Sequence, residues 1–284
     1  MTTQPPASVE DRLRPLRVAA AQAESAAGDV TTNVATAVDL VGSASAQRAR
    51  VVVLPELFLT GYDPDSWGVS PESLVSVDDS RLQPLAEAAR AHAVVVVAGA
   101  AVRRDHRATL SLLVFGGTGE VSAPYDKQHL FDTEQGFFTA GDHGASLIVD
   151  GWELGLGICY DGCFPAHATA AADDGALAYL CPSAYYVGSE HRRDLYYAAR
   201  ALDNGMYVVF SGLVGHCGDY EFNGGSAIYD PEGRPVERLG TQAAAFAIAD
   251  LDATVVSRVR AKNPIGRDRL DSLGERARQV METG

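Results

Sequence analysis

The chain has 284 residues and is 46% hydrophobic and 21% charged, which is the composition of an ordinary globular protein. Its formal net charge of -14, from 23 Lys and Arg against 37 Asp and Glu, argues against nucleic acid or an anionic membrane surface as a partner. No stretch is long and apolar enough to span a bilayer, and the first residues do not form a secretory signal. We therefore expect a cytoplasmic protein with a flexible N-terminal arm over residues 1–15 and a single domain over residues 16–284.

Short β-rich runs alternate with longer amphipathic runs along the chain. Strands are predicted over residues 17–22, 51–54, 94–100, 110–115, 121–126, 147–149, 154–158, 177–181, 207–211, 226–229 and 245–250. Helices are predicted over residues 33–48, 81–91, 165–173 and 190–204. The last helix would carry Leu195, Ala199 and Leu202 on one face and end at Gly205.

Two turn sequences join successive predicted strands without a helix between them. Residues 117–120 (GTGE) and 230–233 (DPEG) are typical of hairpin turns. A hairpin pairs its strands antiparallel, whereas a doubly wound parallel sheet would need a helical crossover at both places. The pattern therefore predicts mixed sheets that pack face to face, with helices outside.

The four cysteines are too few and too irregularly spaced for a disulfide scaffold, which fits a reducing cytoplasm. Cys159 and Cys163 have no second ligand pair at a spacing suited to zinc, because the other cysteines, Cys181 and Cys217, stand apart. We therefore expect free thiols and no structural metal.

One of these cysteines lies between a predicted strand and a predicted helix, in LGLGICYDGCFP (residues 154–165). Cys159 directly follows the strand, where open α/β folds place their chemistry. Pro165 opens the helix, whose positive end would favour the thiolate and hence nucleophilicity. The alternative is that Cys159 is a small buried hydrophobic residue, the commonest role of a free cysteine.

A thiol nucleophile needs a base and a group that holds negative charge. Glu56 follows the predicted strand 51–54 among apolar neighbours, where desolvation would raise its pKa toward the range useful for proton transfer, although it could equally cap a loop. Lys127 ends the second arm of a predicted hairpin beside Tyr125, where most lysines extend to water. His129 is an alternative base, but no Asp or Asn beside it marks it as oriented.

These residues lie in the segments LPELFLTGY, YDKQHLF and GICYDGCFP, where 71 positions separate Glu56 from Lys127 (127 − 56) and 32 separate Lys127 from Cys159 (159 − 127). In this combination the segments resemble the three catalytic blocks of the nitrilase superfamily of carbon-nitrogen hydrolases. EQGFFTAGD, CPSAYY, YYAARALDNGMYVV and GGSAIYDPEGRPV are similar to further family segments, so the resemblance covers about residues 16–270.

The resemblance implies a catalytic triad of Glu56, Lys127 and Cys159, with Glu134 in EQGFFTAGD as an additional active-site glutamate. Glu56 would take the proton of Cys159, whose sulfur attacks an amide carbonyl to give a thioester that water then hydrolyses. Lys127 and the backbone N–H of Tyr160 would hold the oxyanion. No cofactor or metal is implied.

The sequence identifies the type of reaction more closely than the substrate. Tyr160 and Asp161 follow Cys159 where nitrile-hydrolysing members typically have Trp and Glu, which favours a small amide. N-carbamoyl amine or nitrile hydrolysis on the same triad is an alternative, and a non-catalytic binding member of the fold is another. Aromatic residues near the three blocks are candidate pocket walls: Tyr62, Phe131, Tyr185, Tyr186, Phe137 and Phe138.

The resemblance also implies an α/β (α+β) fold, a four-layer α-β-β-α sandwich of two mixed sheets. It implies a homodimer or higher homo-oligomer that pairs through outer helices, with the segment after Cys163 and the helix 190–204 at the interface. Asp203 and Ala166 stand where the family usually has Glu, which bears on helix anchoring or substrate choice and not on catalysis.

Overall fold

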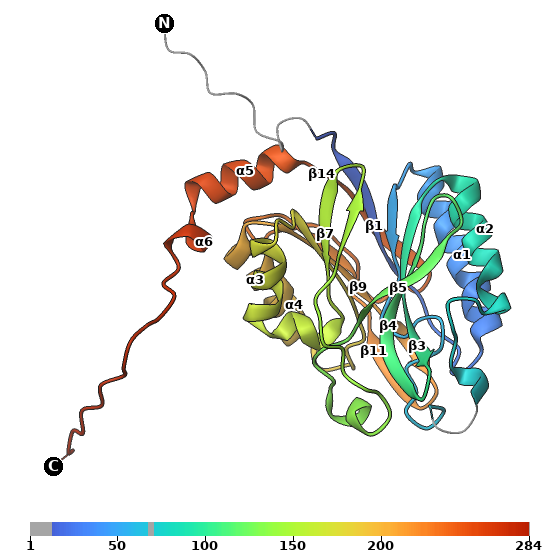
Figure 1. Ribbon diagram of the computed structural model, residues 1–284, viewed down its shortest axis with the longest axis horizontal. Helices are drawn as coiled ribbons and strands as arrows, with labels where there is room; N and C mark the ends of the chain where they lie inside the picture. Colours follow the sequence, from blue (N-terminus) through green and yellow to red (C-terminus); the bar gives the residue numbers. More distant parts are fainter. Residues whose placement is uncertain (1–12, 68–70, 284) are drawn as a thin grey trace, which may run out of the picture.

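Two six-stranded sheets lie face to face in the computed structural model, which describes residues 13–67 and 71–283 (Figure 1). The first sheet contains β1 (Leu16–Gln22), β2 (Val51–Val53), β3 (Val95–Arg104), β4 (Arg107–Phe115), β5 (Val121–Asp126) and β14 (Ala245–Leu251), in the order β14-β1-β2-β3-β4-β5. The second contains β6 (Ser146–Val149), β7 (Trp152–Leu156), β8 (Ala178–Ser183), β9 (Tyr207–Gly212), β12 (Ala227–Tyr229) and β13 (Pro235–Arg238), in the order β13-β12-β9-β8-β7-β6.

Both sheets mix parallel and antiparallel pairs. β1, β2 and β3 pair in parallel, whereas β4 pairs antiparallel with both β3 and β5. The predicted turn at 117–120 joins β4 to β5. In the second sheet β7, β8 and β9 are parallel, and the turn at 230–233 joins the antiparallel strands β12 and β13. The prediction of mixed sheets is confirmed.

Helices cover the outer face of each sheet. α1 (Val30–Ala46) and α2 (Gln83–His92) lie on the first sheet, and α3 (Pro165–Asp173) and α4 (Glu190–Asn204) lie on the second (Figure 1). α1 begins where the Asp29 carboxylate accepts a hydrogen bond from the Thr32 N–H at 3.0 Å, and α4 ends at Gly205 in the left-handed conformation. The predicted four-layer α-β-β-α sandwich is confirmed.

Alternation along the strands of the second sheet divides its side chains between two cores. Leu180 and Val209 face the first sheet, in a large aliphatic cluster shared by both sheets. Tyr179 and Phe210, one position away, pack in a smaller cluster with residues of α3 and α4. The Ser211 hydroxyl, on β9, donates to the backbone carbonyls at the ends of β1 and β2, at 2.5 and 2.9 Å. These bonds fix one sheet on the other next to the loop that follows β2.

The apolar stripe predicted on α4 does not face the protein core. Leu195 is 69% exposed and Leu202 is 43% exposed, so the stripe points outward. The buried side of the helix instead carries Arg193 and Arg200, whose charges are compensated by hydrogen bonds. Asp203, which departs from the family pattern, forms an ion pair with Arg200 at 2.7 Å.

Some helices and strands were not among the ranges predicted from the sequence: β10 (Val214–Cys217), β11 (Tyr220–Asn223), β13, α5 (Ala253–Lys262) and α6 (Ile265–Asp268). Most of the predicted N-terminal arm, residues 1–12, lies outside the described residues. Within the remainder, Leu13 packs against the core and the Arg14 carbonyl accepts a hydrogen bond from the Trp152 indole at 2.9 Å. In the described part of the chain, no helix combines the length and apolar character needed to cross a membrane.

Candidate active site

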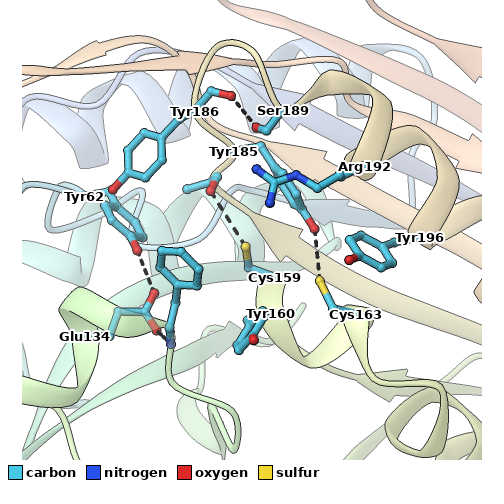
Figure 2. A pocket seen from close by; sticks show the side chains of 12 residues that line it. Tyr62, Glu134, Cys159, Tyr160, Cys163, Tyr185, Tyr186, Ser189, Arg192 and Tyr196 are labelled. Carbon is cyan, nitrogen blue, oxygen red and sulfur yellow. Dashed lines mark hydrogen bonds between the residues drawn. The ribbon is translucent and has the colours of Figure 1, made fainter.

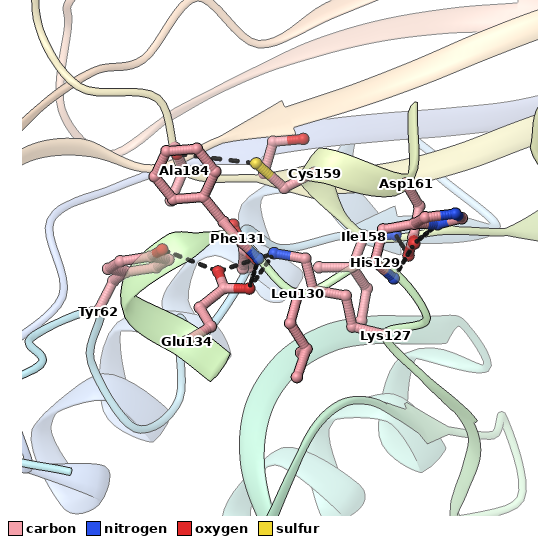
Figure 3. A network of polar contacts seen from close by, with 12 residues as sticks. Tyr62, Lys127, His129, Leu130, Phe131, Glu134, Ile158, Cys159, Asp161 and Ala184 are labelled. Carbon is pink, nitrogen blue, oxygen red and sulfur yellow. Dashed lines mark hydrogen bonds and ion pairs between the residues drawn. The ribbon is translucent and has the colours of Figure 1, made fainter. Parts of the chain in front are cut away.

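Three loops that follow strands bring the chemically active side chains together. Glu56 comes three positions after the end of β2, and Lys127 directly follows β5. Cys159 follows β7 and opens a 3-10 turn, Cys159–Cys163, that precedes α3. Glu134 comes from a second 3-10 turn, Asp132–Gly136, in the loop after Lys127. The two sheets therefore both contribute to one site (Figure 3).

Lys127 lies between two carboxylates in a fully buried cluster. Its Nζ is 2.6 Å from Oε1 of Glu56 and 2.7 Å from each carboxylate oxygen of Glu134 (the Lys127–Glu134 contact is drawn in Figure 3). The side chains of all three residues are 0% exposed. Glu134 also accepts hydrogen bonds from the Tyr62 hydroxyl and the Phe131 N–H, each at 2.8 Å, so both of its oxygens are engaged.

Glu56 keeps one carboxylate oxygen without a hydrogen bond. Its Oε2 is buried and has no hydrogen-bond partner among the described residues. Burial raises the pKa of Glu56 to about 7, because desolvation and the nearby Glu134 charge outweigh the Lys127 ammonium. The Cys159 thiol is near enough to lower this pKa slightly. Glu56 can therefore accept and release a proton near neutral pH.

Lys127 remains a cation in this environment. Burial alone lowers the pKa of a lysine, but the charges of Glu56 and Glu134 more than reverse this and raise the pKa of Lys127 well above its usual range. The cluster therefore presents a fixed ammonium beside a carboxylate that titrates.

Cys159 adopts a backbone conformation that is unusual for a residue with a side chain. Its φ is +43°, in the left-handed region, which costs on the order of 1–3 kcal/mol for a residue other than glycine. The Tyr197 hydroxyl stabilises this turn by donating to the Cys159 carbonyl at 3.1 Å. The thiol is half-buried and lies 3.8 Å from the Ala184 carbonyl. The backbone thus points Sγ into the pocket (Figure 2).

Burial opposes the Cys159 thiolate that a helix N-terminus was expected to favour. Burial and the neighbouring Glu56 raise the pKa of Cys159 well above its usual value, although Lys127 opposes this shift. The 3-10 turn separates Cys159 from the first residue of α3, which limits the effect of that helix dipole. The resting sulfur is a thiol and needs a base to become a nucleophile.

Asp161 connects the loop of Lys127 to the turn of Cys159, a role that the sequence did not reveal. Its buried carboxylate accepts hydrogen bonds from the Ile158 N–H at 3.0 Å, the His129 N–H at 2.8 Å and the Tyr125 hydroxyl at 2.7 Å. Burial raises its pKa, but the hydrogen bonds and charge of its histidine neighbours lower it below the usual value overall. His129 is oriented by Asp161 and stacks on Phe164, so it belongs to this support and does not line the pocket.

A pocket of about 100 Å³ opens onto Cys159 (Figure 2). The predicted aromatic walls Tyr62, Phe131, Tyr185 and Tyr186 all line it, as does Tyr160. The predicted pair Phe137 and Phe138 does not line it, because both rings pack against Trp67, with centroids 5.5 and 4.9 Å away.

The opposite wall of the pocket comes from α4 and the turn before it, which the sequence did not identify as part of the site. Ser189, Arg192 and Tyr196 line this wall, together with Cys163. All four cysteines of the chain are free thiols. Among the described residues, no group of three or more His, Cys, Asp or Glu side chains is arranged to hold a metal ion.

The carbon-nitrogen hydrolase family model matches residues 17–261. Human omega-amidase is 28% identical over 85% of this chain and 90% of its own length, and 2-oxoglutaramate amidase of Bacillus subtilis is 30% identical over 78% and 85%. A Glu-to-Gln variant of the Nesterenkonia sp. AN1 amidase aligns with a TM-score of 0.79 and 27% identity over 93% of this chain and 97% of that one, and it carries the acetamide moiety of fluoroacetamide on its active-site cysteine. From the extent of these matches, the chain belongs to the carbon-nitrogen hydrolase family, within the nitrilase superfamily.

Proposed function

We propose that this protein hydrolyses the carbon-nitrogen bond of a small amide, giving a carboxylic acid and ammonia or an amine, through a thioester on Cys159. The observation that carries the proposal is the buried cluster of Glu56, Lys127 and Glu134 beside a thiol that opens onto a pocket. Relatives named omega-amidase and 2-oxoglutaramate amidase support an amide substrate.

In the first half of the proposed reaction, Oε2 of Glu56 takes the proton of the Cys159 thiol and Sγ attacks the amide carbonyl carbon. The carbonyl oxygen becomes an oxyanion, held by the Lys127 ammonium and the backbone N–H of Tyr160. Glu56 then gives its proton to the amide nitrogen, the carbon-nitrogen bond breaks, and ammonia or an amine leaves. The acyl group remains on Cys159 as a thioester.

In the second half, Glu56 takes a proton from a water molecule whose oxygen attacks the thioester carbon. The same donors hold the second oxyanion, and its collapse breaks the carbon-sulfur bond to release the carboxylic acid. Glu56 returns its proton to the sulfur and the thiol is restored. Glu134 takes no proton in this scheme; its two oxygens position Lys127.

The energetics of the cluster also favour a catalytic role. Three fully buried charged groups cost several kcal/mol each to desolvate, and such clusters contribute little net stability compared with apolar packing. Oε2 of Glu56 adds a buried oxygen without a hydrogen bond, which costs about 1–3 kcal/mol in a folded protein. A buried oxygen that destabilises the fold in this way is expected at a catalytic site, where its lone pair is available to accept a proton.

The test is ammonia release from a panel of small amides, N-carbamoyl amines and nitriles. We expect amides to be the best substrates and Cys159→Ala to abolish turnover while the protein stays folded by circular dichroism. Cys217→Ala, at a free cysteine outside the pocket, is the matched control and should keep activity. Lys127→Met should slow the reaction at least about a hundredfold. Substantial turnover by Cys159→Ala would refute the mechanism, and a preference for nitriles or carbamoyl amines would replace the substrate class.

A further inference from the structure

His167, in the first turn of α3, links the two sheets through both of its ring nitrogens. Its Nε2 is 2.8 Å from the hydroxyl of Tyr125 on β5, and its Nδ1 is 2.9 Å from the hydroxyl of Tyr179 on β8. The His167 side chain is 5% exposed, and both tyrosines are fully buried. Buried polar groups are costly unless each has a partner, and the proposed reaction gives this histidine no role.

The Asp161 carboxylate determines which atom donates in each of these hydrogen bonds. The pKa of Asp161 lies below its usual value, so the ionised group can only accept, and the Tyr125 hydroxyl donates to its Oδ2 at 2.7 Å. The Tyr125 oxygen must then accept from the Nε2–H of His167. This leaves Nδ1 of a neutral ring to accept from the Tyr179 hydroxyl. The bonds therefore run in one direction, from Tyr179 through His167 and Tyr125 to Asp161, in what we call the His167 relay.

The His167 relay requires a neutral imidazole ring. Burial lowers the pKa of His167 and outweighs the opposing charge of Asp161, whose Oδ1 lies 4.0 Å from Nε2. A protonated ring would carry a hydrogen on both nitrogens, so the Tyr179 hydroxyl could no longer donate to Nδ1. The ring is thus held in one tautomer, with its hydrogen on Nε2.

A glycine between β7 and Cys159 makes room for this relay. A Cβ atom at Gly157 would clash with the Tyr179 hydroxyl, although the Gly157 backbone is not in the left-handed region. The close approach of Tyr179, and not the backbone conformation, therefore requires a glycine at this position. The relay passes directly beside the segment that carries the nucleophile.

Asp161, at the end of the relay, holds the two segments that supply the proposed oxyanion donors (Figure 3). Its Oδ2 also accepts from the Ile158 N–H, and its Oδ1 accepts from the His129 N–H. Ile158 comes two positions before Tyr160, and His129 comes two positions after Lys127. The orientation of the Asp161 carboxylate therefore affects how the Lys127 ammonium and the Tyr160 N–H are spaced.

We propose that His167 is a positioning residue for the hydrolysis: it keeps Tyr125 as a donor to Asp161 and thereby fixes the spacing of the two oxyanion donors. This inference rests on the proposed amide hydrolysis at Cys159. Because the oxyanion forms only as the reaction proceeds, a change in this spacing should act on kcat and leave KM nearly unchanged. A residue that only filled space under α3 would have no such selective effect.

The test is the steady-state kinetics of amide hydrolysis by variants of the relay. His167→Phe keeps a ring and removes both hydrogen bonds, so kcat should fall at least about tenfold, with KM within about twofold of wild type. His167→Gln should recover part of kcat, because its amide N–H can donate to Tyr125. Tyr179→Phe should also lower kcat, because the ring can then carry its hydrogen on Nδ1 and stop donating to Tyr125.

The double variant and a matched control separate the relay from general damage. His167→Phe combined with Tyr179→Phe should lose no more kcat than His167→Phe alone, because both changes break the same relay. His106→Phe makes the same substitution at an exposed histidine between β3 and β4 and should keep wild-type kinetics. Circular dichroism checks the fold of each variant. If His167→Phe does not fold, Tyr179→Phe and His167→Gln carry the kinetic test.

A measurement without substrate tests the relay independently of turnover. The ¹⁵N NMR signals of the His167 ring, assigned by their loss in His167→Gln, should show a neutral ring with its hydrogen on Nε2 at pH 8. A charged ring, or a hydrogen on Nδ1, would overturn the inference, as would unchanged kcat in the folded variants or equal changes in kcat and KM. Each of these results would leave amide hydrolysis intact. Absence of Cys159-dependent turnover for every amide in the wild-type protein would instead overturn the proposed function, whatever the tautomer of His167.

Discussion

A single carboxylate, Glu56, determines how the proposed site depends on pH. It shares the Lys127 ammonium with Glu134, but only Glu134 has both oxygens engaged. Glu56 is therefore the carboxylate that can gain a proton most readily, and burial raises its pKa to about 7. Lys127, whose pKa is shifted upward, stays charged throughout this range.

We predict that kcat/KM falls as the pH is lowered through about 7, because protonated Glu56 cannot take the thiol proton. The slope should correspond to one proton. Glu56→Gln should reduce the rate at least about a hundredfold at every pH. The exposed Glu87→Gln serves as the control and should keep the wild-type profile. A wild-type rate that is flat between pH 5 and 8 would remove Glu56 as the base.

The same pKa has a consequence for stability, with a defined sign. The pKa of Glu56 is raised on folding from about 4.5 to about 7, so its contribution to folding stability is present below pH 4.5 and is lost as the pH rises to 7. Glutamine has no such loss. The melting temperature of Glu56→Gln relative to wild type should therefore increase between pH 5 and pH 8, as measured by calorimetry.

At the scale of elements, predictions succeeded where the local pattern was strong. The limits of β5, α3 and α4 agree with the sequence, because Pro165 starts α3 and Gly205 ends α4. β10 and β11 were missed because they are four-residue strands, interrupted by polar residues and glycine, that pair mainly with each other. α5 was missed because its consecutive valines, Val255 and Val256, follow a strand and favour strand in isolation.

The residues of the site likewise include some that a local sequence pattern predicted and some that it did not. Glu56, Lys127 and Cys159 each follow a recognisable strand, so their sequence context marked them before any contact was known. The roles of Asp161 and Arg192 depend on contacts between segments that are distant in the sequence. Asp161 receives its hydrogen bonds from the Lys127 loop, and Arg192 reaches the pocket from a helix whose apolar stripe faces the other way. No local pattern encodes such contacts.

The loop of Glu56 also depends on close contact with β3. A Cβ atom at Gly99 would lie 2.4 Å from the Leu57 nitrogen and 2.6 Å from the Glu56 Cα, so any side chain there must displace this loop. We predict that Gly99→Ala lowers both the melting temperature and kcat, the latter because a displacement of about 1 Å misplaces the base. Gly42→Ala in α1 is the control, because a Cβ atom there would lie 3.8 Å from the nearest atom, an ordinary contact. This substitution should stabilise the protein by about 0.4–1 kcal/mol. Full activity in Gly99→Ala would show that the position of Glu56 tolerates this shift.

At the scale of the whole molecule, the outward stripe of α4 fits the homodimer that the family resemblance implies. Leu195 and Leu202 lie on this stripe, and exposed apolar side chains on one helix face are typical of a contact surface. The same helix contributes Arg192 and Tyr196 to the pocket, so an interface on its outer side would hold one pocket wall in place. The interface would thereby also affect substrate binding.

We predict that Leu195→Asp shifts the protein from dimer to monomer in light scattering after size exclusion. Ile148→Asp is the control, because Ile148 is 68% exposed, about as much as Leu195 at 69%, but lies on β6 instead of α4. Each copy carries a formal charge of -14, so the two copies repel each other and added salt should tighten an apolar interface by screening that repulsion. Dissociation by salt would point to ion pairs instead, and an unchanged dimer in Leu195→Asp would place the interface on another surface.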